Sequence, residues 1–238
     1  VVAGFTATFS NTMMVGFALF ENIFGEAGII ILTKIVALHL PIMLLATGIQ
    51  IEWVNALEAQ NQKSVQTDKP SYWHVFKSLN YIEIIINTIK QLVVNPYIIG
   101  IAGGLFFRQF NFQPEGITKN FLDTIIASVT PLALFSLGMA LNHYGVRGQI
   151  KASIMLVGLK LMFMPFLVLV IAYFIELPTL TLKIAILTAA LPVGINAWLV
   201  AEQFKTGQRL AATSISMGTV TSLVTIGFWF WLIEQLAL

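Results

Sequence analysis

Long apolar stretches make up most of the chain and are separated by short polar connections. A helix needs about 20 mostly apolar residues to cross the hydrocarbon core of a bilayer. Seven stretches approach this length, the third only if the Ile-rich residues 81–92 extend it. They are residues 1–20, 27–51, 92–107, 120–142, 152–175, 179–201 and 210–233. The pattern therefore predicts an all-α polytopic membrane protein with seven spans in this chain, packed as antiparallel neighbours wherever the connection is short.

Composition supports a membrane protein and excludes several other classes. Hydrophobic residues make up 57% of the chain and charged residues 10%, whereas a soluble domain carries about 25% charged residues. A lipid environment accepts such an apolar surface. The net charge of +2 does not indicate a nucleic-acid partner. The chain has no cysteine, which excludes disulfides and thiolate metal sites, and we expect no cofactor and no metal.

Basic residues are distributed unequally between the two sides of the predicted spans. One side holds Lys63, Lys69, Lys77, Lys90, Arg147, Lys151, Lys205 and Arg209, and the other holds Arg108, Lys119 and Lys183. Cytoplasmic loops carry an excess of Lys and Arg. The chain is therefore predicted to lie in the cell membrane, the inner membrane if it is bacterial. Its long polar connection at residues 52–91 is then cytoplasmic and its C-terminus is outside.

The first and sixth segments share a short pattern. Aligning GFALFENIFGE (16–26) with AWLVAEQFKTGQ (197–208) places Glu21 on Glu202 and Phe17 on Trp198. The two segments are five crossings apart and so run in opposite directions through the membrane. This relation is typical of inverted repeats with five spans in each unit.

The repeat predicts how the chain is organised. Residues 1–57 are the last two helices of the first repeat, residues 58–91 are a cytoplasmic loop with an interfacial segment, and residues 92–238 are the second repeat. Two complete repeats have ten helices, of which about seven are present here. We therefore expect three further spans before Val1.

Both repeated segments contain residues that weaken a helix in mid-span. Pro192 lacks an N–H group and Gly194 relaxes the backbone. The first segment instead has Ser10-Asn11-Thr12 and Gly16. A broken helix frees N–H groups at the start of its second half, and these groups bind anions together with the helix dipole. The predicted binding residues are Asn11, Thr12, Pro192, Gly194 and Asn196. The alternative is a simple proline kink with polar contacts between helices.

Several stretches resemble the auxin efflux carrier family, which includes plant auxin exporters and bacterial malonate or malate permeases. They are SNTMMVG (10–16), NPYIIGIAGGLFF (95–107), PLALFSLGMAL (131–141), GLKLMFMPF (158–166) and ALPVGINAWLVAEQF (190–204), and the Ser/Thr-rich final span matches as well. The resemblance implies ten spans in two inverted five-span units, with two broken helices that cross near the membrane midplane. It also implies a carboxylate substrate at this crossing and alternating access. One departure is Phe17-Ala18, where relatives often have a proline.

Two charged residues are candidates for coupling or for electrostatic support of the anion. Lys160 lies inside the fifth segment and matches a family lysine position. The alternative is a lysine whose long side chain lets the ammonium reach the membrane interface. Glu202 follows the sixth segment and is a candidate for gating or proton coupling; the alternative is an ordinary interfacial carboxylate.

These features together predict a secondary transporter for a small organic anion, such as a mono- or dicarboxylate. The expected partners are this anion and the lipid bilayer, with a homodimer as a further candidate. The alternatives are a membrane channel and a membrane-embedded enzyme. The chain has no HExxH or GxSxG motif and no cysteine nucleophile, so we do not expect an enzyme.

Overall fold

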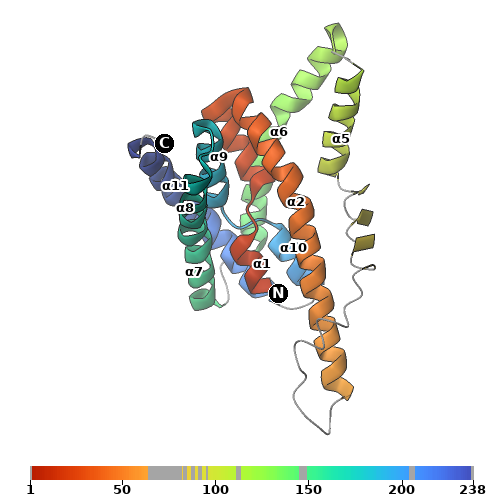
Figure 1. Cartoon of the computed structure of the whole chain (residues 1–238), viewed down its shortest axis with the longest axis vertical. Helices are drawn as coiled ribbons and strands as arrows, with labels where there is room; N and C mark the ends of the chain where they lie inside the picture. The colour runs from red at the N-terminus through yellow and green to blue at the C-terminus, as the bar shows by residue number, and fades with distance from the viewer. Residues whose placement is uncertain are drawn as a thin grey trace. The chain divides into compact units, whose positions relative to one another are not determined.

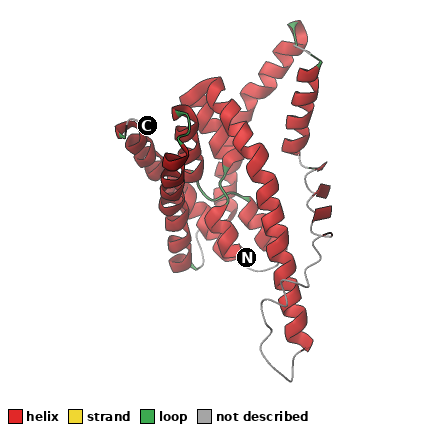
Figure 2. Cartoon of the chain, viewed as in Figure 1, coloured by secondary structure: helices red, strands yellow, loops and turns green. Residues whose placement is uncertain are grey.

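The computed structural model describes residues 2–63, 82, 85–86, 89–90, 93–94, 96–110, 114–144, 149–203 and 207–236. These residues are almost entirely helical and include no β-strand (Figure 2). In chain order the elements (Figure 1) are α1 (Val2–Thr8), the π-helix η1 (Thr12–Gly16), α2 (Phe17–Lys63), α5 (Pro96–Gln109), α6 (Gly116–Tyr144), α7 (Ile150–Gly158), the π-helix η2 (Leu159–Phe163), α8 (Met164–Ile175), α9 (Thr179–Ala190), α10 (Asn196–Gln203) and α11 (Gln208–Gln235). The predicted all-α class is confirmed.

The chain divides into two compact units, Ala37–Pro114 and Val2–Val36 with Glu115–Leu238. The first unit contains α5 and the later part of α2. The second, called the core unit below, contains the remaining helices and both predicted breaks. This division by contacts differs from the division by repeats, which stays a prediction.

Three helical stretches of the described chain are long and apolar enough to cross a membrane. They are Thr12–Gln50, Ile150–Ile175 and Gln208–Gln235, and the helices at Ile98–Gln109 and Thr179–Ala190 are apolar but shorter. Large apolar side chains also lie on the outside of the core unit: Leu223 is 79% exposed and Phe174 is 78% exposed. Such a surface suits hydrocarbon better than water, so the molecule is a polytopic membrane protein.

The first two predicted spans are separated by a kink within α2. Gly25 leaves the helical conformation with φ 59° and ψ −150°, a region that glycine enters without steric cost. Gly28 is buried, and a Cβ atom added to it would lie 2.5 Å from the Cβ of Phe24. The kink falls in the predicted connection at residues 21–26.

The long polar connection is helical at its start, because α2 continues to Lys63. The next part of this connection, residues 64–81, lies outside the described residues.

The hydrophobic centre of the core unit lies where α2, α8, α9 and α11 pack together. Its buried residues are Phe20, Leu32, Val36, Ala172, Leu182, Ile184, Ile186, Leu187, Ala190, Trp229 and Ile233. Helix α9 contributes the largest share, and its second half is buried up to the break at Leu191. The end of α9 is therefore held in a well-packed environment.

Candidate functional site

The two predicted breaks are present, and they touch each other. Helix α1 ends at Thr8 before η1 begins, and α9 ends at Ala190 before α10 begins. Between these ends Ser10 and Val193 form an isolated antiparallel bridge. The Asn11 N–H donates to the Pro192 carbonyl at 2.8 Å, and the Gly194 N–H donates to the Phe9 carbonyl at 2.8 Å. We call this meeting of residues 9–11 and 191–195 the crossing (Figure 2).

Proline and glycine produce the break between α9 and α10. The residue before a proline disfavours the helical conformation, and Leu191 is extended, with φ −61° and ψ 149°. Gly194 is needed because the other loop approaches so closely. A Cβ atom at Gly194 would lie 2.6 Å from Phe9 Cδ1 and 3.0 Å from the Ser10 carbonyl oxygen. The LPVG sequence thus opens the helix and admits the second loop.

Polar side chains produce the break between α1 and η1, where there is no proline. Asn11 precedes the first residue of η1, and its Oδ1 accepts the Met14 N–H at 3.3 Å. The Ser10 hydroxyl donates to the Thr188 carbonyl at 2.9 Å. Such side chains offer the backbone an alternative to continued helix. Thr12 begins η1 and is buried.

The Asn11 amide has one half of its hydrogen-bonding capacity unused. Its oxygen caps η1, whereas Nδ2 is buried and has no hydrogen-bond partner within the described residues. A buried donor without a partner is costly, and an amide NH2 group can only donate. The unused group therefore suits a ligand that carries acceptors. Asn196, the equivalent candidate, is the first residue of α10 and is partly buried.

Pro192 and Gly194 take part in the crossing through their backbones. The Pro192 carbonyl and the Gly194 N–H are both occupied by the opposite loop. These residues fix the shape of the crossing, and the N–H groups that follow them, at Ile195 and Asn196, donate to no backbone carbonyl in the described chain.

Lys160 lies beside the end of α9. Its side chain is 0% exposed, and it is the one charged residue among those that the structure describes as buried. Nζ donates to the Ala189 carbonyl at 2.5 Å, in the last turn of α9. A helix C-terminus favours a cation, so the ammonium is placed where its burial costs least. The Glu202 side chain lies outside the part of the chain whose side chains are described.

The sequence did not predict a group of buried hydroxyls on α7 and α11. Ser153, Thr213, Ser214 and Ser216 are buried, and their oxygen atoms have no partner within the described residues. Further along α11, Thr219 donates to a carbonyl of its own helix. The sequence signals for these residues are that they are polar within apolar spans and that the final span is rich in Ser and Thr.

Helix α11 also passes close to the crossing. A Cβ atom at Gly218 would lie 3.4 Å from Val193 Cγ2 and 3.6 Å from Val157 Cγ2. Helix α11 thus lies close to both the crossing and α7, and a Cβ atom at Gly218 would make ordinary van der Waals contact with each.

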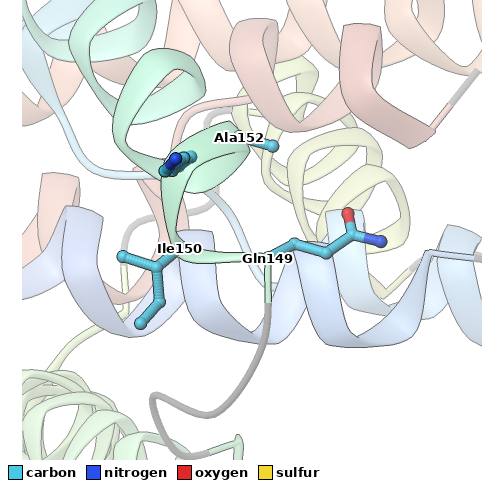
Figure 3. Close-up of a pocket in the computed structure, with 4 residues that line it drawn as sticks. Gln149, Ile150 and Ala152 are labelled. Atoms are coloured by element: carbon cyan, nitrogen blue, oxygen red, sulfur yellow. The ribbon is translucent and has the colours of Figure 1, made fainter.

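A separate hollow of about 500 Å³ lies at the first turn of α7 (Figure 3). It is lined by Gln149, Ile150, Lys151 and Ala152, and all four side chains are exposed. The predicted binding residues do not line it, so the hollow is not part of the candidate site.

A family model described as membrane transport protein matches residues 1–230, almost the whole chain. The chain belongs to the auxin efflux carrier family. The resemblance of the five motifs is therefore confirmed, and the crossing formed by the first and last of these motifs lies within the matched region. The family is one of membrane transport proteins.

Three relatives show what the chain is similar to. Auxin efflux carrier component 8 of Arabidopsis thaliana is 24% identical over 94% of this chain and 68% of its own length. An uncharacterized transporter of Methanothermobacter thermautotrophicus is 26% identical over 59% of the chain and 46% of its own length. A protein of Rhizobium meliloti named "Putative malonate transporter" is 25% identical over 63% of the chain and 47% of its own length. The chain thus spans about half the length of the two prokaryotic relatives.

Proposed function

We propose that this chain is part of a secondary transporter that moves a small organic anion, a mono- or dicarboxylate, by alternating access. The carboxylate is held at the crossing. The single observation that carries this proposal is the Asn11 amide, whose Nδ2 is buried at the crossing and has no hydrogen-bond partner among the described residues. The transported anion supplies the missing acceptor.

The balance of donors and acceptors at the crossing favours an anion. Two of the carbonyls that the break exposes are already used: Ser10 donates to Thr188, and Lys160 donates to Ala189. Unused donors remain at Asn11 and at the start of α10. Carboxylate oxygens accept such bonds, and hydrogen bonds to charged groups contribute about 1.5–3 kcal/mol each. The buried ammonium of Lys160 adds a favourable charge.

The names of the relatives support the same class of substrate. Malonate appears in the name of the Rhizobium meliloti protein, and auxin in that of the Arabidopsis thaliana protein. Both compounds carry a carboxylate but differ in the rest of the molecule. We therefore extend to this chain the shared carboxylate and not either whole molecule.

The test replaces the two asparagines in the full-length carrier. Asn11→Ala and Asn196→Ala each remove a side-chain donor, and Asn11→Ala also removes the Oδ1 cap of η1, which Asn11→Asp retains. We expect each variant to bind the carboxylate about tenfold more weakly or worse, equivalent to roughly 1.4 kcal/mol. Aspartate at either position should weaken binding further, because it opposes the anion with a negative charge. Affinity is measured in nanodiscs against a panel of mono- and dicarboxylates that includes malonate.

Asn22→Ala is the matched control. Asn22 is exposed, and its Nδ2 donates to the Ala18 carbonyl of its own helix at 2.7 Å, so this variant should bind like the parent.

A counterflow assay distinguishes a carrier from a channel, because a carrier exchanges external labelled substrate for internal unlabelled substrate. Parental binding and transport by both alanine variants would move the substrate away from the crossing.

A further inference from the structure

Pro165 leaves one carbonyl of the α7–η2–α8 span without a donor. In an α-helix the carbonyl of residue i accepts the N–H of residue i+4. For Leu161 that residue is Pro165, which has no N–H group. The helix widens at this point into the π-helix η2, where the Met164 N–H reaches back five residues to the Leu159 carbonyl. Single π-turns of this kind occur often at functional sites.

Trp229 supplies the missing donor from a different helix. Its Nε1–H donates to the Leu161 carbonyl at 2.8 Å, and both residues are buried, with 3% and 1% of their surface exposed. An indole nitrogen can only donate. In the dry interior of a membrane protein an unpaired carbonyl is costly. The bond therefore satisfies a carbonyl within the π-turn and ties this turn to α11.

Lys160 lies in the same π-turn, directly before Leu161. A π-turn contains more residues than an α-turn, so it changes the direction in which its side chains leave the helix. Here the Lys160 ammonium is aimed at the Ala189 carbonyl, three residues before Pro192. The direction of this one buried charge among the described residues thus depends on the π-turn, which also contains Leu161, the acceptor of the indole bond.

We propose that Trp229 is a positioning residue of the transport site. Its N–H keeps the turn at η2 wide and thereby directs Lys160 to the end of α9 beside the crossing. Trp229 acts through Lys160 and does not contact the substrate. The consequence for transport rests on the proposed function, whereas the link from Trp229 to the π-turn stands without it.

The first test is a double-mutant cycle on the stability of the full-length carrier in detergent. Trp229→Phe keeps an aromatic ring but loses the N–H, and we expect a lower melting temperature. Pro165→Ala gives residue 165 an N–H that can bond to the Leu161 carbonyl. In this background Trp229→Phe should cost much less. An equal cost in both backgrounds would show that Trp229 contributes packing only and would overturn the proposal.

The second test measures the consequence for the site by malonate binding and uptake. Trp229→Phe should weaken binding about tenfold, but it should have little further effect in a Lys160→Met background, because the residue that it positions is already gone. Pro165→Ala should also lower uptake, since its turn can relax to an α-turn and redirect Lys160, although the protein remains stable. Trp231→Phe is the control, since Trp231 is 56% exposed on the same helix. Additive effects of the Trp229 and Lys160 substitutions would contradict the proposal.

The two proposals fail in different ways. A parent protein that binds no carboxylate of the panel contradicts the proposed function, but the stability cycle still decides whether Trp229 holds the π-turn. A parent that binds malonate, together with a Trp229→Phe variant that binds it equally well, contradicts the positioning role alone.

Discussion

Lys160 is a charged residue enclosed on all sides within a membrane protein. A lysine at mid-bilayer costs on the order of 3 kcal/mol on insertion scales, and its bond to Ala189 offsets part of this cost. We expect Lys160→Met to lower carboxylate affinity tenfold or more, because the site loses its positive charge, while the protein still inserts and folds. Lys160→Arg should also be impaired, since a planar guanidinium does not replace a point charge.

The control for this prediction is Lys34→Met. Lys34 lies on α2 in the same unit, and its side chain is exposed. Binding isotherms and uptake are measured for both variants at matched expression. They distinguish the effect of the charge at Lys160 from the effect of a change in net charge. Parental transport by Lys160→Met would leave the lysine with a structural role at the end of α9.

The role of a single residue could be predicted from the sequence only where a residue of suitable chemistry also interrupts an apolar span. Asn11 and Pro192 stand out because a polar residue and a proline interrupt apolar spans. The sequence does not show that Asn11 uses its oxygen as a cap and keeps its NH2 group free, because this depends on the position of Met14. The indole bond of Trp229 joins residues 68 positions apart, and no local pattern predicts it.

The elements meet at Gly194, where two broken helices approach closely enough to exclude a side chain. Gly194→Ala would place a Cβ atom 3.0 Å from the Ser10 carbonyl oxygen, which is backbone and cannot rotate away. We expect a loss of stability of about 1–3 kcal/mol, typical of overpacking, and a loss of transport as the bonds across the crossing are displaced. Thermal or denaturant unfolding in detergent measures the first effect.

Gly227→Ala provides the comparison for this substitution. Gly227 lies in α11, and an added Cβ atom would meet nothing within 4 Å. Because alanine has the higher helix propensity, this variant should be as stable as the parent or slightly more so. Equal stability of the two alanine variants would mean that the loops separate without cost, which contradicts the close approach at the crossing.

The helical elements are largely predictable because apolar length is a strong signal in membrane proteins. The described parts of all seven predicted spans are helical, and both predicted breaks are present. The π-turns were not predicted. At η2 the signal was Pro165 four residues after Leu161, but whether a helix kinks, widens or ends at a proline depends on which neighbour supplies a donor. The helical start of the long connection, up to Lys63, was also missed, because its polar residues lack an apolar face.

At the scale of the whole molecule, the contact between the two broken segments agrees with the expected inverted repeat but does not establish it. The antiparallel bridge at Ser10 and Val193 joins residues from the two proposed repeats. The ten-helix organisation stays a prediction.

The orientation of the molecule in the membrane follows from charge and can be tested with one helical span. Residues Ile150–Ile175 form a continuous stretch of 26 residues, roughly 39 Å at 1.5 Å per residue. We therefore expect its two ends to lie on opposite sides of a bilayer. The excess of Lys and Arg on one side predicts that the end near Ala152 is cytoplasmic and that the end near Thr179, at the start of α9, is outside.

Because the chain has no cysteine, single cysteines at these two exposed positions can be labelled without background from other thiols. In intact cells a membrane-impermeant maleimide should label Thr179→Cys and should label Ala152→Cys only after the cells are permeabilised. The reverse pattern would invert the orientation, and labelling of both variants in intact cells would show that this helix does not cross the membrane.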